Sequence, residues 1–146
     1  MNVETSKKVL KISGILTIVL GVFLLLLGIL AMVAGGSLVG NTNADLTADV
    51  TNDVAVAIGG GFVLIISAIL TLIEGIISYQ AGKTGKKKLA TISLVLAVLS
   101  TISSIYNLLS GASNSTASNI VSTVVGIAIN VLVCYASYVV RQAAVD

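Results

Sequence analysis

The sequence predicts an all-α polytopic membrane protein, a four-transmembrane-helix antiparallel bundle built from two hairpins. Hydrophobic residues make up 56% of the 146 residues, before the 14 Gly are counted, and charged residues only 10%. Soluble domains are about 45–50% apolar with Gly included and about 25% charged. The few charges leave uncharged runs at residues 12–44, 54–73 and 89–140. Runs of at least about 18 such residues are typical of helices that cross a bilayer.

Four spans fit these runs, because a helix needs about 20 residues to cross roughly 30 Å of hydrocarbon. The longest run contains two spans, and the small and polar residues between them favour a turn. The predicted spans are residues 12–34, 54–79, 89–110 and 119–140, with outer loops at 35–53 and 111–118 and a cytoplasmic loop at 80–88. The whole chain, 1–146, is then a single transmembrane domain.

All eight basic residues lie on one side of these spans, and the outer loops contain neither Lys nor Arg. The basic residues are Lys7, Lys8, Lys11, Lys83, Lys86, Lys87, Lys88 and Arg141. By the positive-inside rule we expect both termini in the cytoplasm and the chain in a cell membrane, the inner or plasma membrane. The net charge of +2 gives no indication of nucleic-acid binding. We expect anionic lipids at the lysines of the cytoplasmic loop, which are Lys83, Lys86, Lys87 and Lys88.

Small residues recur every seven positions on the first two spans. This glycine seam consists of Gly14, Gly21 and Gly28 on the first span and Gly61, Ala68 and Gly75 on the second. Helices in lipid gain little from being apolar together, so they associate where small residues allow close approach. Antiparallel pairing brings the two sets into register, from Gly14 opposite Gly75 to Gly28 opposite Gly61. We therefore predict that the first two spans form a tight hairpin.

Polar residues repeat at the same interval on the last two spans. This polar seam consists of Ser93, Ser100 and Asn107 on the third span and Thr123, Asn130 and Ser137 on the fourth. Antiparallel pairing sets Ser100 opposite Asn130, and each bond between helices contributes roughly 0.6 to 2 kcal/mol. The sequence therefore predicts a hydrogen-bonded second hairpin. Another register remains open, through the small residues Ala90, Ala97, Ser104 and Gly111.

Little polar chemistry is available for catalysis. The chain has no His, which excludes Ser–His pairs and His-ligated zinc. Its one cysteine, Cys134, has no intramolecular partner. Asp45, Asp49 and Asp53 recur every four residues, a helical pattern that predicts a start of the second helix near residue 43. This spacing lacks the calcium-binding loop. We expect no enzyme activity, no metal and no cofactor.

Glu74 is the one charged residue within a predicted span, about 7–8 Å from its cytoplasmic end. A carboxylate in hydrocarbon is costly, and two interpretations remain open. In the first, Glu74 snorkels to the interface or pairs with Lys11 across the glycine seam. In the second, Glu74 is protonated and exchanges protons or a cationic substrate during transport, with Asn130, Tyr135 and Tyr138 nearby.

In topology and composition the chain resembles small four-span integral membrane proteins of bacteria. Its four short helices and single membrane-embedded glutamate are also similar to the small multidrug resistance transporters. That family carries its glutamate in the first helix and relies on aromatic residues including Trp, whereas Glu74 lies in the second span of a chain without Trp. No site residue is therefore transferred from that family.

We expect the function to depend on how the helices pack against other helices. The sequence predicts a non-enzymatic membrane protein that acts through helix–helix association, as a homo-oligomer or as an accessory subunit of a membrane complex. The alternative is a small proton- or cation-coupled transporter or channel with Glu74 as its membrane-embedded carboxylate.

Overall fold

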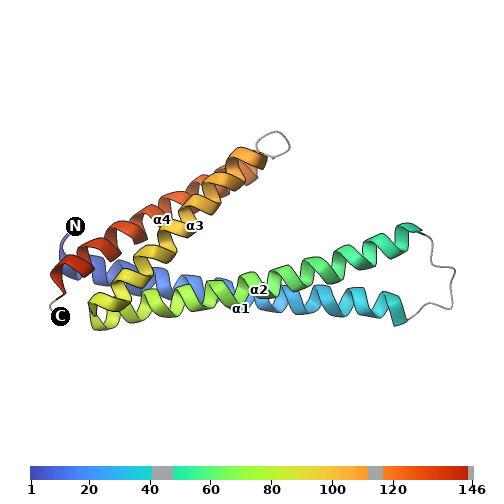
Figure 1. The fold of residues 1–146 in the computed structure, drawn as a ribbon, viewed down its shortest axis with the longest axis horizontal. Coiled ribbons are helices and arrows are strands. Elements are labelled where there is room, and N and C mark those ends of the chain that lie inside the picture. Colours follow the sequence, from blue (N-terminus) through green and yellow to red (C-terminus); the bar gives the residue numbers. More distant parts are fainter. Residues whose placement is uncertain (41–47, 112–116, 145–146) are drawn as a thin grey trace. The chain divides into compact units, whose positions relative to one another are not determined.

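Four long helices make up the computed structural model, which describes residues 1–40, 48–111 and 117–144 (Figure 1). In chain order they are α1 (Val3–Gly40), α2 (Ala48–Thr84), α3 (Lys87–Gly111) and α4 (Ala117–Ala143). The predicted all-α fold of two hairpins is confirmed, with α1 packed on α2 and α3 packed on α4. Each helix is long and apolar enough to cross a membrane, so the chain is a multi-pass membrane protein.

The helices run past the predicted spans. With 38 and 37 residues, α1 and α2 are each about 55 Å long, whereas the hydrocarbon core is about 30 Å thick. Residues 35–40 and 48–53 of the predicted outer loop are helical. Asp45 and the expected helix start near residue 43 lie outside the described residues.

Most of the predicted cytoplasmic loop at 80–88 is also helical, because α2 continues to Thr84 and α3 begins at Lys87. Helix α2 continues through the polar and charged residues Gln80, Lys83 and Thr84, and it stops at Gly85, whose left-handed φ of 66° favours glycine. The Gly85 N–H donates to the Ala81 carbonyl at 2.9 Å, and the Lys86 carbonyl accepts from the Ala90 N–H at 3.0 Å. One helix therefore ends and the next begins within two residues.

Asn2 caps the start of α1. Its side-chain oxygen accepts a hydrogen bond from the Thr5 N–H at 2.8 Å, and its carbonyl accepts from the Ser6 N–H at 3.0 Å. Glu4 lies in the first turn, where the helix dipole favours a negative charge. These contacts satisfy N–H groups that a helix start leaves without partners.

The chain divides into two compact units, the second of which comprises residues 17–73. This unit is a two-helix hairpin whose backbones touch at small residues. A Cβ atom added to Gly28 would lie 3.0 Å from the Gly61 carbonyl oxygen, and one added to Gly61 would lie 2.8 Å from the Gly28 oxygen. A Cβ on Gly21 would lie 2.8 Å from the Leu72 side chain, and Ala68 is fully buried. The contacts follow the register of the glycine seam.

The first unit contains residues 1–16 and 74–146. Here α1 and α2 approach as closely as they do in the second unit. A Cβ on Gly14 would lie 2.5 Å from the Tyr79 backbone nitrogen and 2.8 Å from the Gly75 oxygen, and one on Gly82 would lie 2.6 Å from the Lys7 oxygen. In this unit the start of α1, the turn between α2 and α3 and the end of α4 lie at one end of the helices (Figure 1), and these segments contain the basic residues. We call this end the basic end.

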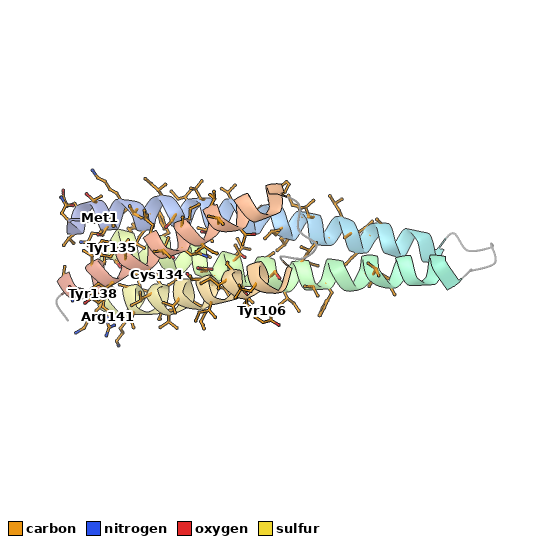
Figure 2. The ribbon with its side chains drawn as sticks, turned by 90° about the horizontal axis from the view of Figure 1, so that it is seen from above. Met1, Tyr106, Cys134, Tyr135, Tyr138 and Arg141 are labelled. Carbon is orange, nitrogen blue, oxygen red and sulfur yellow. The ribbon has the colours of Figure 1, made fainter. Side chains whose placement is uncertain are left out.

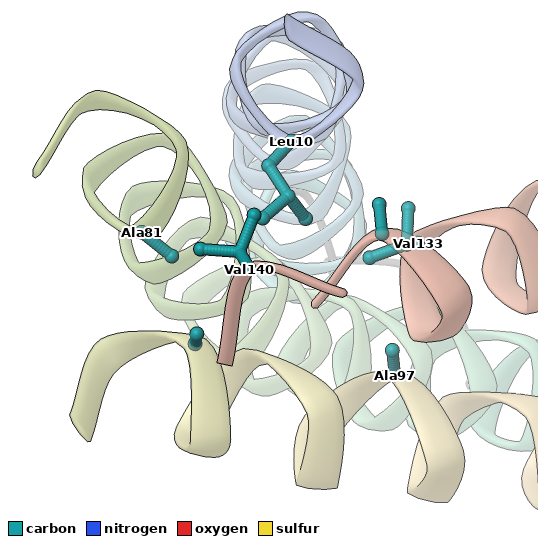
Figure 3. Close-up of a cluster of buried hydrophobic side chains, with 7 residues drawn as sticks. Leu10, Ala81, Ala97, Val133 and Val140 are labelled. Carbon is teal, nitrogen blue, oxygen red and sulfur yellow. The ribbon is translucent and has the colours of Figure 1, made fainter. Parts of the chain in front are cut away.

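All four helices contribute to the core of the first unit (Figure 3). Its buried apolar residues are Leu10, Ala81, Ala90, Ala97, Val133, Ala136 and Val140. Four of these seven are alanines, which allow the close van der Waals contact that holds helices together in lipid. Many of the larger apolar side chains of this unit, such as Ile92 and Leu132, are exposed, where lipid can surround them.

We predict that Gly14→Ala destabilises the chain by about 1–3 kcal/mol, because its methyl group would collide with the backbone at Tyr79. The matched control is Gly60→Ala, since no described atom lies within 4 Å of a Cβ there. Unfolding by SDS in mixed micelles, followed by far-UV circular dichroism, measures both. Equal stabilities of the two variants would contradict the observed packing.

Candidate membrane-embedded polar site

Three buried serines join α2, α3 and α4 in what we call the serine layer. The Ser93 hydroxyl oxygen lies 3.0 Å from that of Ser78 and 3.1 Å from that of Ser137, and the three residues are at most 3% exposed. A hydroxyl offers one donor and two acceptor positions, so Ser93 can bond both neighbours at once. The serine layer is therefore internally satisfied.

Ser78 was missed by the sequence reasoning, although Ser93 and Ser137 belong to the predicted polar seam. Its position contains a usable signal, because Ser78 and Ser93 lie at nearly equal distances along the chain on either side of Gly85. Two antiparallel helices joined by a tight turn bring such positions to the same level.

A second polar contact lies one helical turn further along α2. The Ser100 hydroxyl donates to the Glu74 carboxylate, at 3.2 Å from Oε2 and 3.3 Å from Oε1. Glu74 is four residues from Ser78, and Ser100 is seven residues from Ser93, so each lies on the same helix face as its serine-layer counterpart. On α4, Asn130 is seven residues from Ser137, just as Ser100 is seven residues from Ser93, which places Asn130 at the level of Ser100 in an antiparallel pair. We call the Glu74–Ser100 contact, together with Asn130, the glutamate layer.

Glu74 lies in a stretch of α2, Ile58–Thr84, that is long and apolar enough to cross a membrane. Along the helix axis it is about 15 Å from Thr84. Its partner Ser100 lies about 20 Å from the start of α3 at Lys87. The contact is therefore several helical turns away from the turn that joins the two helices.

Lys11, the predicted partner of Glu74, does not pair with it. A Cβ on Gly82 would lie 2.8 Å from the Lys11 backbone nitrogen, so Lys11 is level with the last turns of α2. Glu74 instead turns its carboxylate towards α3, and no ion pair joins it to Lys11 in the part of the chain that the structure describes. The glycine seam occupies the face of α2 that contacts α1, which leaves Glu74 on another face.

Asn130 also departs from its predicted pairing. Its predicted partner Ser100 is engaged with Glu74, and no hydrogen bond joins the half-buried Asn130 side chain to any described residue. Gly126 lies one turn away on the same face of α4, and no described atom lies within 4 Å of a Cβ built there. The polar seam is therefore bonded at Ser93 and Ser137 and open at Asn130.

Other predicted residues lie on α3 and α4 outside the two polar layers defined above. Thr123 is half-buried, and the side chain of Asn107 lies outside the described residues. Tyr135 and Tyr138 are exposed on α4 (Figure 2), and Cys134 is a half-buried free thiol. Within residues 1–40, 48–111 and 117–144, no group of three His, Cys, Asp or Glu side chains could hold a metal ion.

These features define a multi-pass membrane protein with two polar layers between helices α2, α3 and α4. Comparison of the chain with models of protein families, with curated proteins and with solved structures finds no match. The polar layers themselves then indicate what chemistry is possible. A carboxylate held by one hydroxyl can take up a proton or a cation, and an amide can bond a group from another helix.

We predict that Ser93→Ala destabilises the chain by about 1–2 kcal/mol, because it removes two bonds between helices and leaves two buried hydroxyls without their partner. The matched control on the same helix is the exposed Ser103→Ala, for which we expect a change within about 0.5 kcal/mol. SDS titration in mixed micelles measures both. A Ser93 variant as stable as the control would show that the serine layer contributes nothing.

Proposed function

We propose that the chain is a non-enzymatic integral membrane protein that acts through helix–helix association, with a second copy of itself or as an accessory subunit of a membrane complex. The observation that supports this function is the Asn130 amide, which lies within a membrane-crossing segment and has no hydrogen-bond partner among the described residues. An amide in hydrocarbon is stabilised by a partner from another helix.

The surroundings of Asn130 favour a helix as that partner. Gly126, one turn away, leaves the space that close backbone approach requires. The chain itself buries little of its spans, from 11% of the most apolar window of α1 to 22% of that of α4. Lipid can cover an apolar surface. The Asn130 amide, which has no partner among the described residues and lies beside the uncovered Gly126, instead needs a polar group within hydrogen-bonding distance.

We also propose an orientation. All the basic residues lie at the basic end, and the positive-inside rule places such an end in the cytoplasm. Both termini would then be cytoplasmic. The small size and the four spans are consistent with the inner membrane of a bacterium.

We predict that Asn130→Leu weakens self-association about fivefold to thirtyfold, because it removes about 1–2 kcal/mol of hydrogen bonding between helices. Energy transfer between labelled copies in liposomes, measured over a range of protein-to-lipid ratios, gives the dissociation constant. The control is Val131→Leu, a substitution at the neighbouring exposed position.

Crosslinking tests the same contact in native membranes. In a Cys134→Ser background, Gly126→Cys should form a crosslinked dimer, whereas Val124→Cys on nearly the opposite, exposed face of α4 should not. A wild-type chain that stays monomeric in liposomes, together with no crosslinked product at Gly126→Cys, would contradict self-association through this face.

A second function, a proton- or cation-coupled transporter or channel, is favoured by one specific observation. Glu74 lies within a segment that is long and apolar enough to cross a membrane, and its carboxylate has a hydroxyl and no cation as its partner among the described residues. A carboxylate in this setting is stabilised by a bound proton or by a cation. Association of several chains would complete such a path, so the two functions are compatible.

We predict that Glu74→Gln abolishes proton- or cation-coupled flux in proteoliposomes if the chain is a transporter, because the amide cannot bind a proton. The control is Glu4→Gln, which removes a carboxylate from an exposed position at the start of α1. A pH-sensitive dye inside the vesicles reports proton flux. Unaltered flux in the Glu74 variant would exclude this carboxylate from the transport step.

A further inference from the structure

The glutamate layer brings oxygen-bearing side chains of three helices to one level. The Ser100 hydroxyl on α3 lies 3.3 Å from Oε1 and 3.2 Å from Oε2 of Glu74 on α2. Asn130 on α4 is half-buried at the level of Ser100, and its amide has no hydrogen-bond partner among the described residues. All three residues lie within segments that are long and apolar enough to cross a membrane, and they belong to one compact unit of the chain.

A neighbouring contact shows that this part of α4 lies against α3 and close to Glu74. The Cys134 thiol is hydrogen-bonded to the Thr101 side chain, and it is near enough to Glu74 to interact with its charge. The Thr101 hydroxyl donates its proton to the Ala97 carbonyl at 2.7 Å, so its oxygen accepts the bond from the thiol. Asn130 lies four residues from Cys134, one turn away on the same side of α4.

The charge of the glutamate layer favours a monovalent cation. Apart from Glu74, no charged residue lies between Asp53 and Lys83, and none lies between Lys88 and Arg141. One monovalent cation would therefore make the layer neutral, whereas a divalent cation would leave a net positive charge in hydrocarbon, which is costly.

The side chains of the layer favour a metal cation over a proton or an organic cation. Carboxylate and carbonyl oxygens are typical ligands of hard metal ions. A proton needs only the carboxylate, whereas Ser100 and Asn130 supply the further oxygens that a metal ion requires. Organic cations are bound against aromatic faces, but Tyr135 is five residues from Asn130, about 140° round the helix, and is exposed (Figure 2).

We propose that the glutamate layer binds one Na⁺ ion through the Glu74 carboxylate, the Ser100 hydroxyl oxygen and the Asn130 amide oxygen. On binding, the Ser100 hydroxyl turns its proton to a backbone carbonyl one turn back on α3, as the Thr101 and Ser104 hydroxyls already do. The Asn130 amide nitrogen keeps its protons for another helix, so ion binding and association are compatible. The inference deepens the second function proposed above and rests on it for the use of the bound ion in transport.

Labelling with dicyclohexylcarbodiimide, which reacts with a protonated carboxyl group in an apolar setting, tests the site without any transport. The purified full-length chain in detergent is labelled at one fixed pH, in NaCl or in the same concentration of N-methyl-D-glucamine chloride. Mass spectrometry measures the adduct at Glu74, which Glu74→Gln should abolish. At a Na⁺ concentration ten times its dissociation constant we expect labelling to slow about tenfold, because the bound ion excludes the proton.

Two variants each remove one oxygen ligand of the ion. For Ser100→Ala and for Asn130→Leu we expect the Na⁺ concentration that gives half-protection to rise about tenfold. The matched control is Ser104→Ala, one turn further along α3, because the Ser104 hydroxyl already donates to the Ser100 carbonyl at 2.9 Å. There we expect a change of less than about twofold. The labelling rate without Na⁺ reports whether a variant keeps its fold, and the comparison on the wild-type chain needs no variant.

The outcomes separate this site from the transport function. Equal labelling in NaCl and in N-methyl-D-glucamine chloride would overturn the site and leave the proton as the ligand of Glu74. A Ser104 variant that loses protection as much as the Ser100 and Asn130 variants would overturn the assignment of the ligands. Protection by Na⁺ together with unaltered flux in the Glu74→Gln variant would support the site and contradict only its use in transport.

Discussion

The backbones of α1 and α2 touch wherever a glycine of one helix faces the other. Lipid does not drive apolar helices together as water does, so van der Waals contact at these positions has to hold the hairpin. The same contact fixes what the rest of α2 can do. Because Gly75 and Gly82 face α1, Ser78 and Glu74 are left to face α3, and the polar layers form where α3 meets α2.

The two polar layers differ in how completely they are satisfied. Each serine of the serine layer has a partner within the chain, and that layer is almost fully buried. The glutamate layer holds a carboxylate with a single hydroxyl and an amide with no partner among the described residues. The serine layer therefore specifies how the helices pack, whereas the carboxylate and the amide of the glutamate layer can still bind a group from outside the chain. Both proposed functions depend on these two groups.

The register of the glycine seam was predictable from sequence. Gly14 and Gly28 belong to a set of small residues that repeats every seven positions, and few antiparallel alignments bring this set opposite the small residues of the other helix. The partner of Glu74 was not predictable, because it depends on how far α2 is rotated about its axis and on where that helix ends. Charged residues near 83 were taken to mark a loop, whereas α2 continues to Thr84 and the backbone changes direction at Gly85.

The turn at Gly85 and Lys86 has a consequence for how the chain enters the membrane. Two residues cannot cross a bilayer, so α2 and α3 must insert as one antiparallel unit with the turn held at a single surface. Four lysines lie in or next to this turn, at positions 83, 86, 87 and 88, and they oppose its translocation. The directions in which the two hairpins cross the membrane are therefore linked. In the orientation proposed above, retention of this turn on the cytoplasmic side would set the direction of both hairpins.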